Sequence, residues 1–198
     1  TDVVEADLHR VFPDAAIRAA LLSLCPECKY CAWASQFKPF NIKAELVKRE
    51  TEIEPCRKYA LAVKSARQRQ IHSLDIAFIA LNGLWCARES SEPDALWLEL
   101  SIFEHEKGME NSPTRPEDDG ITHLIMGELY RQSRNFEAAS EHYNLAAQDK
   151  SIVKEVLEHQ RSLTAKGLST VTAIPLRIVR ILFDLVESDG TSLTKEIA

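Results

Sequence analysis

The spacing of its apolar residues constrains the fold of this chain more than any other feature of the sequence. After the cysteine-containing N-terminal part, apolar residues recur three and four positions apart, as they do on one face of an amphipathic helix. Strand-like alternation is absent, except at residues 17–24. We therefore predict an all-α fold. The expected helices cover residues 42–52, 56–69, 73–85, 93–108, 121–132, 136–147, 152–168 and 174–187.

The composition argues against several classes of protein. The 198 residues include only 6 glycines and 8 prolines, few for a chain that uses glycine-rich loops to hold phosphates. The formal net charge of −6 argues against a dedicated nucleic-acid binder. No apolar stretch is long enough to span a membrane, and residues 1–7 do not look like a signal peptide. We expect a cytoplasmic protein, and the lack of an initiator Met leaves open whether the natural chain extends before Thr1.

Two of the expected helices, 121–132 and 136–147, carry residues at the spacing of a tetratricopeptide repeat, which is a pair of antiparallel helices. Small residues are needed where the helices touch, and large ones where they leave space. His123 and Ser151 depart from the pattern, because an aromatic residue and a proline are usual there. The matching positions are Gly127, Tyr130, Ala139, Tyr143 and Ala146. This segment therefore resembles a tetratricopeptide repeat, although any helical hairpin tolerates such residues.

The preceding pair of helices fits the same frame less well. Gly83 and Ala95 take the two small positions, but Cys86 and Glu99 stand where aromatic residues are expected. Because one hairpin cannot bury its apolar face alone, such repeats stack into a superhelix. We predict tetratricopeptide-like stacked helical hairpins, an α-α superhelix with a small N-terminal cysteine-containing segment. The domain boundaries expected from this are 1–40 for that segment, 41–190 for the helices and 191–198 for a tail.

A stack of this kind has a concave groove lined by the first helix of each pair, and the groove binds a peptide or a helix of another protein. The resemblance implies that residues on one face of helix 121–132 line it, namely Leu124, Glu128, Arg131 and Gln132. The alternative is a solvated face with ordinary helical ion pairs, each worth about 0.2–0.5 kcal/mol. The expected partner is a protein, including a second copy of this chain, and neither nucleic acid nor a membrane.

Three of the five cysteines form a cluster, Cys25, Cys28 and Cys31, with two overlapping C-x-x-C spacings. Two thiolates at this spacing can bind one tetrahedral zinc ion. A closed zinc site needs a fourth ligand, for which Cys56, Cys86 and His9 are candidates. Zinc knuckles usually have a left-handed glycine where Lys29 stands, and a side chain there costs about 1 kcal/mol. Zinc is therefore the expected cofactor if the protein has one.

Three other interpretations of the cluster remain open. Iron–sulfur binding expects a further cysteine followed by proline, but here Cys56 comes after Pro55. Thioredoxin-type redox chemistry expects the C-x-x-C motif in an α/β fold. The third interpretation is that these cysteines are small buried residues in a protein that holds no metal.

The segment Leu24-Cys25-Pro26-Glu27-Cys28-Lys29-Tyr30-Cys31-Ala32 resembles the C-P-x-C-G-Y-A motif of an uncharacterised bacterial family. In that family the motif follows an earlier C-x-x-C pair and precedes tetratricopeptide-like helices. Residues 84–89, 123–131 and 137–139 are also similar to the family. The earlier pair is not in this chain, and Lys29 replaces the glycine of the motif. The resemblance implies an architecture rather than an activity.

No catalytic signature accompanies these patterns. The sequence has no H-E-x-x-H, no G-x-S-x-G and no phosphate-binding loop, and its six histidines are dispersed. We therefore expect a protein–protein interaction or scaffolding module rather than an enzyme. The alternative is a metal- or redox-linked protein that uses the cysteine cluster.

Overall fold

The computed structural model describes residues 3–37, 53–111, 119–175 and 178–179. The chain forms two compact units. Unit 1 comprises Thr1–Arg10 together with Thr114–Ala198, and unit 2 comprises Val11–Pro113. Each unit is described separately below. In the described part of the chain, no helix has both the length and the apolar character needed to cross a membrane.

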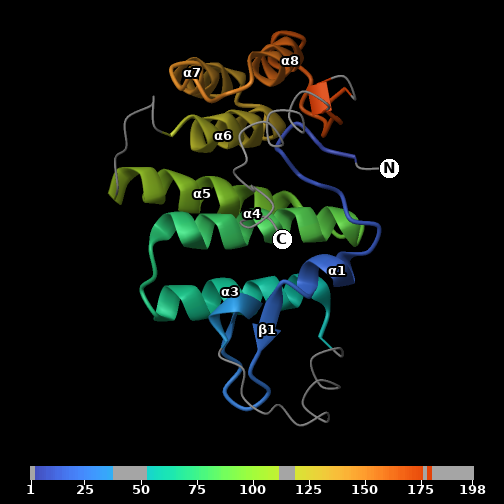
Figure 1. Ribbon diagram of the computed structural model, residues 1–198, viewed down its shortest axis with the longest axis vertical. Coiled ribbons are helices and arrows are strands. Elements are labelled where there is room, and N and C mark those ends of the chain that lie inside the picture. Colours follow the sequence, from blue (N-terminus) through green and yellow to red (C-terminus); the bar gives the residue numbers. More distant parts are fainter. Residues whose placement is uncertain (1–2, 38–52, 112–118, 176–177, 180–198) are drawn as a thin grey trace. The chain divides into compact units, whose positions relative to one another are not determined.

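Unit 2 begins with short elements and continues with three long helices (Figure 1). The short elements are α1 (Ala15–Ala19), β1 (Leu22–Leu24), β2 (Cys31–Trp33) and the 3-10 helix η1 (Ala34–Gln36). The strands form an antiparallel hairpin in which Leu24 pairs with Cys31. The long helices are α3 (Pro55–Gln68), α4 (Ser73–Glu89) and α5 (Ala95–Asn111).

Local chemistry explains where two of these helices begin. Pro55 is the first residue of α3, a favoured place because its missing N–H would have no helical partner there. The ring of His72 caps α4, since its Nδ1 accepts a hydrogen bond from the Leu74 N–H at 3.3 Å. The helix therefore starts one residue later, at Ser73.

The core of unit 2 is built around α4, which packs against both α3 and α5 (Figure 1). Buried residues occur on every face of α4. The helix is therefore largely apolar all round rather than amphipathic. Gly83 lets α5 approach closely, because a Cβ at this position would overlap the ring of Trp97. The strand residues Leu22, Leu24 and Cys31 belong to the same core cluster. The cysteine-containing segment is therefore part of unit 2.

Unit 1 contains the helices α6 (Gly120–Gln132), α7 (Phe136–Ala146) and α8 (Lys154–Ala165). Helices α6 and α7 pack closely at Gly127, where a Cβ would overlap the ring of the fully buried Tyr143. Ala139 is also fully buried. The side chain of Asn135 caps α7 through the Ala138 N–H at 3.2 Å.

Sequence periodicity predicted most of these helices correctly. The helices expected over 56–69, 73–85, 93–108, 121–132, 136–147 and 152–168 are confirmed, with shifted ends. The helix expected over 42–52 and most of the one expected over 174–187 lie outside the described residues. The structure is mostly helical, in agreement with an all-α fold. Strand β2 was not expected, and β1 occupies the end of the segment 17–24 where alternation was noted.

Candidate functional site

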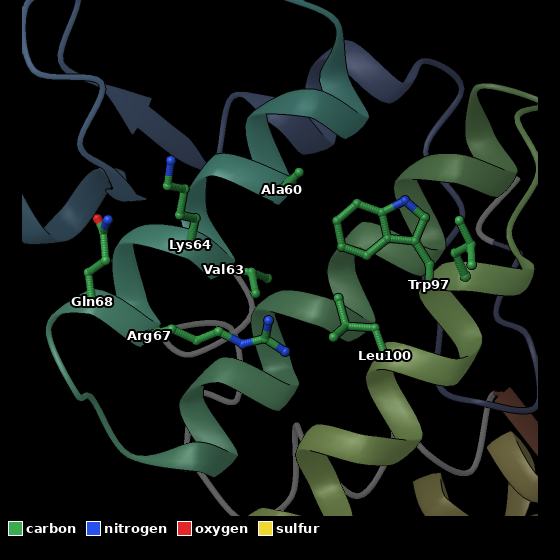
Figure 2. Close-up of a pocket in the computed structure, with 8 residues that line it drawn as sticks. Ala60, Val63, Lys64, Arg67, Gln68, Trp97 and Leu100 are labelled. Carbon is green, nitrogen blue, oxygen red and sulfur yellow. The ribbon is translucent and has the colours of Figure 1, made fainter.

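A groove in unit 2 lies between α3 and α5 and has a volume of about 460 Å³. Figure 2 shows its lining, with α3 on one side and α5 on the other. The α5 side is apolar, and Leu96 at the start of this helix is 79% exposed. The α3 side adds cationic and polar side chains. The lining residues are Ala60, Val63, Lys64, Arg67, Gln68, Leu96, Trp97 and Leu100.

An ion pair joins the two sides of the groove. Arg67 Nε donates a hydrogen bond to Glu104 Oε1 at 2.8 Å, and the Arg67 side chain remains 47% exposed. Glu104 is fully buried, and its Oε2 has no hydrogen-bond partner among the described residues. A carboxylate this deeply buried depends on a nearby positive charge. Arg67 therefore neutralises Glu104 and also fixes the spacing of α3 and α5.

This arrangement suits an amphipathic helix of a partner. Exposed apolar side chains can bury the apolar face of such a helix, and Lys64 and Arg67 lie beside them. The groove holds neither a nucleophile next to a base nor a cluster of metal ligands in the part of the chain that the structure describes. Its chemistry is that of binding.

The residues expected to line a tetratricopeptide groove lie elsewhere, on α6 of unit 1. Leu124, Glu128 and Arg131 are buried, and Gln132 is half-buried. Arg131 is paired with Glu128 through Nε to Oε2 at 2.9 Å, and its Nη2 donates to the carbonyl of Thr170 at 3.0 Å. It also donates to the carbonyl of Leu168. These three side chains are therefore taken up by the interior of unit 1 and are not presented to a partner.

Further bonds complete this buried network around Glu128. The Tyr143 hydroxyl donates to Glu128 Oε2 at 3.1 Å, and Gln132 Nε2 donates to Glu128 Oε1 at 3.1 Å. Burial raises the pKa of Tyr143, and the charge of Glu128 adds to this effect. Burial opposes the charged form of Arg131, but the hydrogen bond and charge of Glu128 outweigh it and raise the pKa of Arg131. Arg131 is therefore charged and Tyr143 neutral at neutral pH.

The cysteine cluster is divided in the structure. Cys25 and Cys28 lie in the turn between β1 and β2, where Cys25 is half-buried and Cys28 is exposed. Hydrogen bonds from the backbone of Cys28 and Glu27 lower the pKa of the Cys25 thiol. Lys29 has a φ of 60°, the left-handed conformation that a glycine usually provides in a zinc knuckle.

Cys31 does not join the other two cysteines. It is buried on β2, and its thiol donates to the Lys58 carbonyl on α3 at 3.4 Å. The expected candidates for a fourth ligand, Cys56 and Cys86, are buried in unit 2, and their side chains are hydrogen-bonded to each other. The structure therefore brings together two of the three predicted metal ligands.

Sequence reasoning missed two sets of residues. The groove between α3 and α5 had a signal in the sequence, since the apolar residues of α5 are spread over more than one face of the helix. They are Leu96, Trp97, Leu98, Leu100, Ile102 and Phe103. The other set is Glu5, Asp7 and His9 in unit 1, whose metal-ligating atoms lie close together.

The chain matches no known protein-family model, and neither a curated protein nor a solved structure shows significant similarity to it.

Proposed function

We propose that this protein is a helical interaction module that binds an amphipathic helix of a protein partner in the groove between α3 and α5. The observation that carries the proposal is the apolar surface formed by the exposed Leu96 and the half-buried Trp97 and Leu100, beside the cationic side chains of Lys64 and Arg67. A partner helix with apolar residues at positions i, i+3, i+4 and i+7 would bury this surface. Acidic residues on the flank of that helix would pair with Lys64.

The energetic argument rests on apolar burial. A fully buried leucine gains about 1.5–3 kcal/mol over an exposed one, and Leu96 is 79% exposed in the free protein. Tryptophan is also enriched among the residues that dominate binding energy at interfaces, and Trp97 lines the groove. The pair α6–α7 supports the tetratricopeptide-like part of the expectation, because small residues stand where its helices touch.

Peptide binding tests this proposal. The probe is a fluorescently labelled amphipathic helical peptide with leucines on one face and glutamates beside them, compared with a peptide that has lysines in place of the glutamates. We expect the acidic peptide to bind about threefold to fivefold more tightly, a difference of less than about 1 kcal/mol, because Lys64 is an exposed charge. Leu96→Glu should abolish binding of the acidic peptide. Ile17→Glu is the matched control, because Ile17 is an exposed apolar residue of the same unit that lies outside the groove.

Two results would count against the groove. One is equal binding of the acidic and basic peptides, and the other is an equal loss of binding in the Leu96→Glu and Ile17→Glu variants. If the protein forms dimers that Leu96→Glu dissociates, the occupant is a second copy of the chain instead of a separate partner. Light scattering at several protein concentrations measures this.

A second candidate function is a metal- or redox-linked role of Cys25 and Cys28. The observation that favours it is the turn geometry, in which backbone N–H groups bond the Cys25 sulfur and Lys29 adopts the left-handed conformation. Two thiolates supply half of a tetrahedral zinc site. Elemental analysis of anaerobically purified protein tests this candidate: less than about a tenth of an equivalent of zinc or iron would rule out the metal version. Free thiols throughout also suit a reducing compartment, so we propose that the protein is cytoplasmic.

A further inference from the structure

Residues 4–10 of unit 1 form a closed loop. Val4 and Arg10 form an antiparallel bridge at its base. Within the loop, the Glu5 N–H donates to the His9 carbonyl at 2.9 Å, and the Leu8 N–H donates to the Glu5 carbonyl at 2.9 Å. Leu8 has a φ of 64°, which allows the chain to reverse direction there. These bonds fix the backbone that carries three potential metal ligands.

Other parts of unit 1 hold the loop in place. The Ala6 N–H donates to the Thr172 carbonyl at 2.9 Å, and the Ile174 N–H donates to the Val4 carbonyl at 2.7 Å. On α8, Gln160 donates through Nε2 to the Ala6 carbonyl. The loop is thus bound from two directions, and its side chains have a supported geometry.

The loop gathers Glu5, Asp7 and His9 into one cluster. The potential ligand atoms of the three side chains all lie within 4.8 Å of one another, and no other such group of three exists among the described residues. His9 Nδ1 lies 2.7 Å from Glu5 Oε2, and Asp7 Oδ1 accepts a hydrogen bond from the His9 N–H at 3.2 Å. Asp7 and His9 are buried, whereas the Glu5 side chain is 19% exposed and gives access from solvent.

The surroundings of the cluster differ from those of an ordinary surface acidic patch. Buried carboxylates require compensating charge. The charge of Asp7 acts on the guanidinium of Arg131, which also pairs with Glu128. Gln160 is fully buried against the loop, and its Oε1 has no hydrogen-bond partner among the residues that the structure describes. The loop thus combines a concentration of negative charge with a buried, unpartnered oxygen beside it.

We propose that Glu5, Asp7 and His9 bind a divalent first-row transition-metal ion. Two carboxylate oxygens and one imidazole nitrogen suit manganese or zinc better than calcium, which prefers oxygen ligands alone. Binding replaces the hydrogen shared by His9 and Glu5 with the metal ion, and any proton carried by the imidazole leaves to solvent. Water entering beside the partly exposed Glu5 completes the coordination shell. These residues belong to unit 1, whereas the groove belongs to unit 2. The test of the metal site is therefore independent of the test of the proposed function.

Manganese is the probe of choice, because the thiols of Cys25 and Cys28 compete for zinc. Titration of the full chain with Mn²⁺, followed by electron paramagnetic resonance, should show one tight site per chain. Glu5→Gln and His9→Gln should each weaken it by about tenfold or more. Glu141→Gln is the matched control, since Glu141 is an exposed carboxylate on α7 of the same unit.

Nuclear magnetic resonance locates the bound ion and guards against variants that misfold. In the wild-type protein, Mn²⁺ should broaden the amide signals of residues 4–10 and 172–174 first. Glu5→Gln should abolish this broadening while leaving the other signals in place. Equal affinity in Glu5→Gln and Glu141→Gln, or broadening centred on another part of the chain, would overturn the proposal.

Discussion

Replacing Arg131 by methionine decides whether this residue belongs to a binding surface or to the interior of unit 1. Its guanidinium is fully buried and pairs with Glu128, and it also donates to the carbonyls of Leu168 and Thr170. Methionine fills a similar volume but leaves Glu128 as a buried charge without its guanidinium, although Tyr143 and Gln132 still donate hydrogen bonds to it. Breaking a buried pair in this way costs about 3–5 kcal/mol. An exposed helical pair would cost about 0.2–0.5 kcal/mol instead.

Urea denaturation followed by far-ultraviolet circular dichroism measures this loss as a change in the free energy of unfolding. Tryptophan fluorescence follows the unfolding of unit 2 in the same samples, because all three tryptophans belong to that unit. They are Trp33, Trp85 and Trp97. Amide hydrogen exchange then shows whether the lost protection lies in α6 and α7. The double variant Arg131→Met with Glu128→Gln should recover part of the stability, since position 128 then carries no buried charge. A loss below about 1 kcal/mol in Arg131→Met would refute the assignment of this pair to the interior.

Three further predictions follow from single positions. Lys29→Gly should stabilise the protein by about 1 kcal/mol in urea denaturation, because glycine adopts the left-handed conformation without strain; an unchanged midpoint would contradict this. Gly127→Ala should destabilise by about 1–3 kcal/mol, since the new Cβ would overlap the fully buried Tyr143 ring, and circular dichroism measures the loss. Burial, with the charge of His123, lowers the pKa of His142 to about 4, so the unfolded chain binds more protons than the folded one below pH 6.5. Stability should therefore fall as the pH drops from about 6.5 to 4, and His142→Gln should flatten this part of the profile.

The sequence predicted the helices well because apolar spacing within a helix is a local signal. Helices α4 and α5 were expected from the runs around Leu84 and Leu100, and both lie there. The sequence did not predict strand β2, because three residues are too few to show the alternation of apolar and polar residues that marks a strand. Its burial against α3 depends on contacts between distant parts of the chain, which periodicity does not reveal.

The candidate site residues show a similar limit. Glu128 and Arg131 stand three positions apart on a helix, which in sequence is indistinguishable from an exposed ion pair. The carbonyls of Leu168 and Thr170, nearly forty positions away, accept hydrogen bonds from Arg131 and so help to make the burial of the pair possible. The equal spacing of the three cysteines likewise does not show which of them lie together. The turn holds Cys25 and Cys28 together, while strand pairing directs Cys31 toward α3.

The two cations of the groove contribute unequally to any partner's binding. Arg67 already neutralises the fully buried Glu104, and its two nitrogens bond the same oxygen of that carboxylate. The charge of Arg67 therefore stabilises the interior of unit 2. If the Arg67 side chain turned toward a partner, Glu104 would be left unpaired at a cost of several kcal/mol. Lys64 is exposed, and so its charge is the part of the groove that an acidic helix meets first. Because a single exposed charge is worth less than about 1 kcal/mol and is screened by salt, affinity must come chiefly from burying Leu96 and Trp97, while Lys64 selects the orientation and charge of the helix.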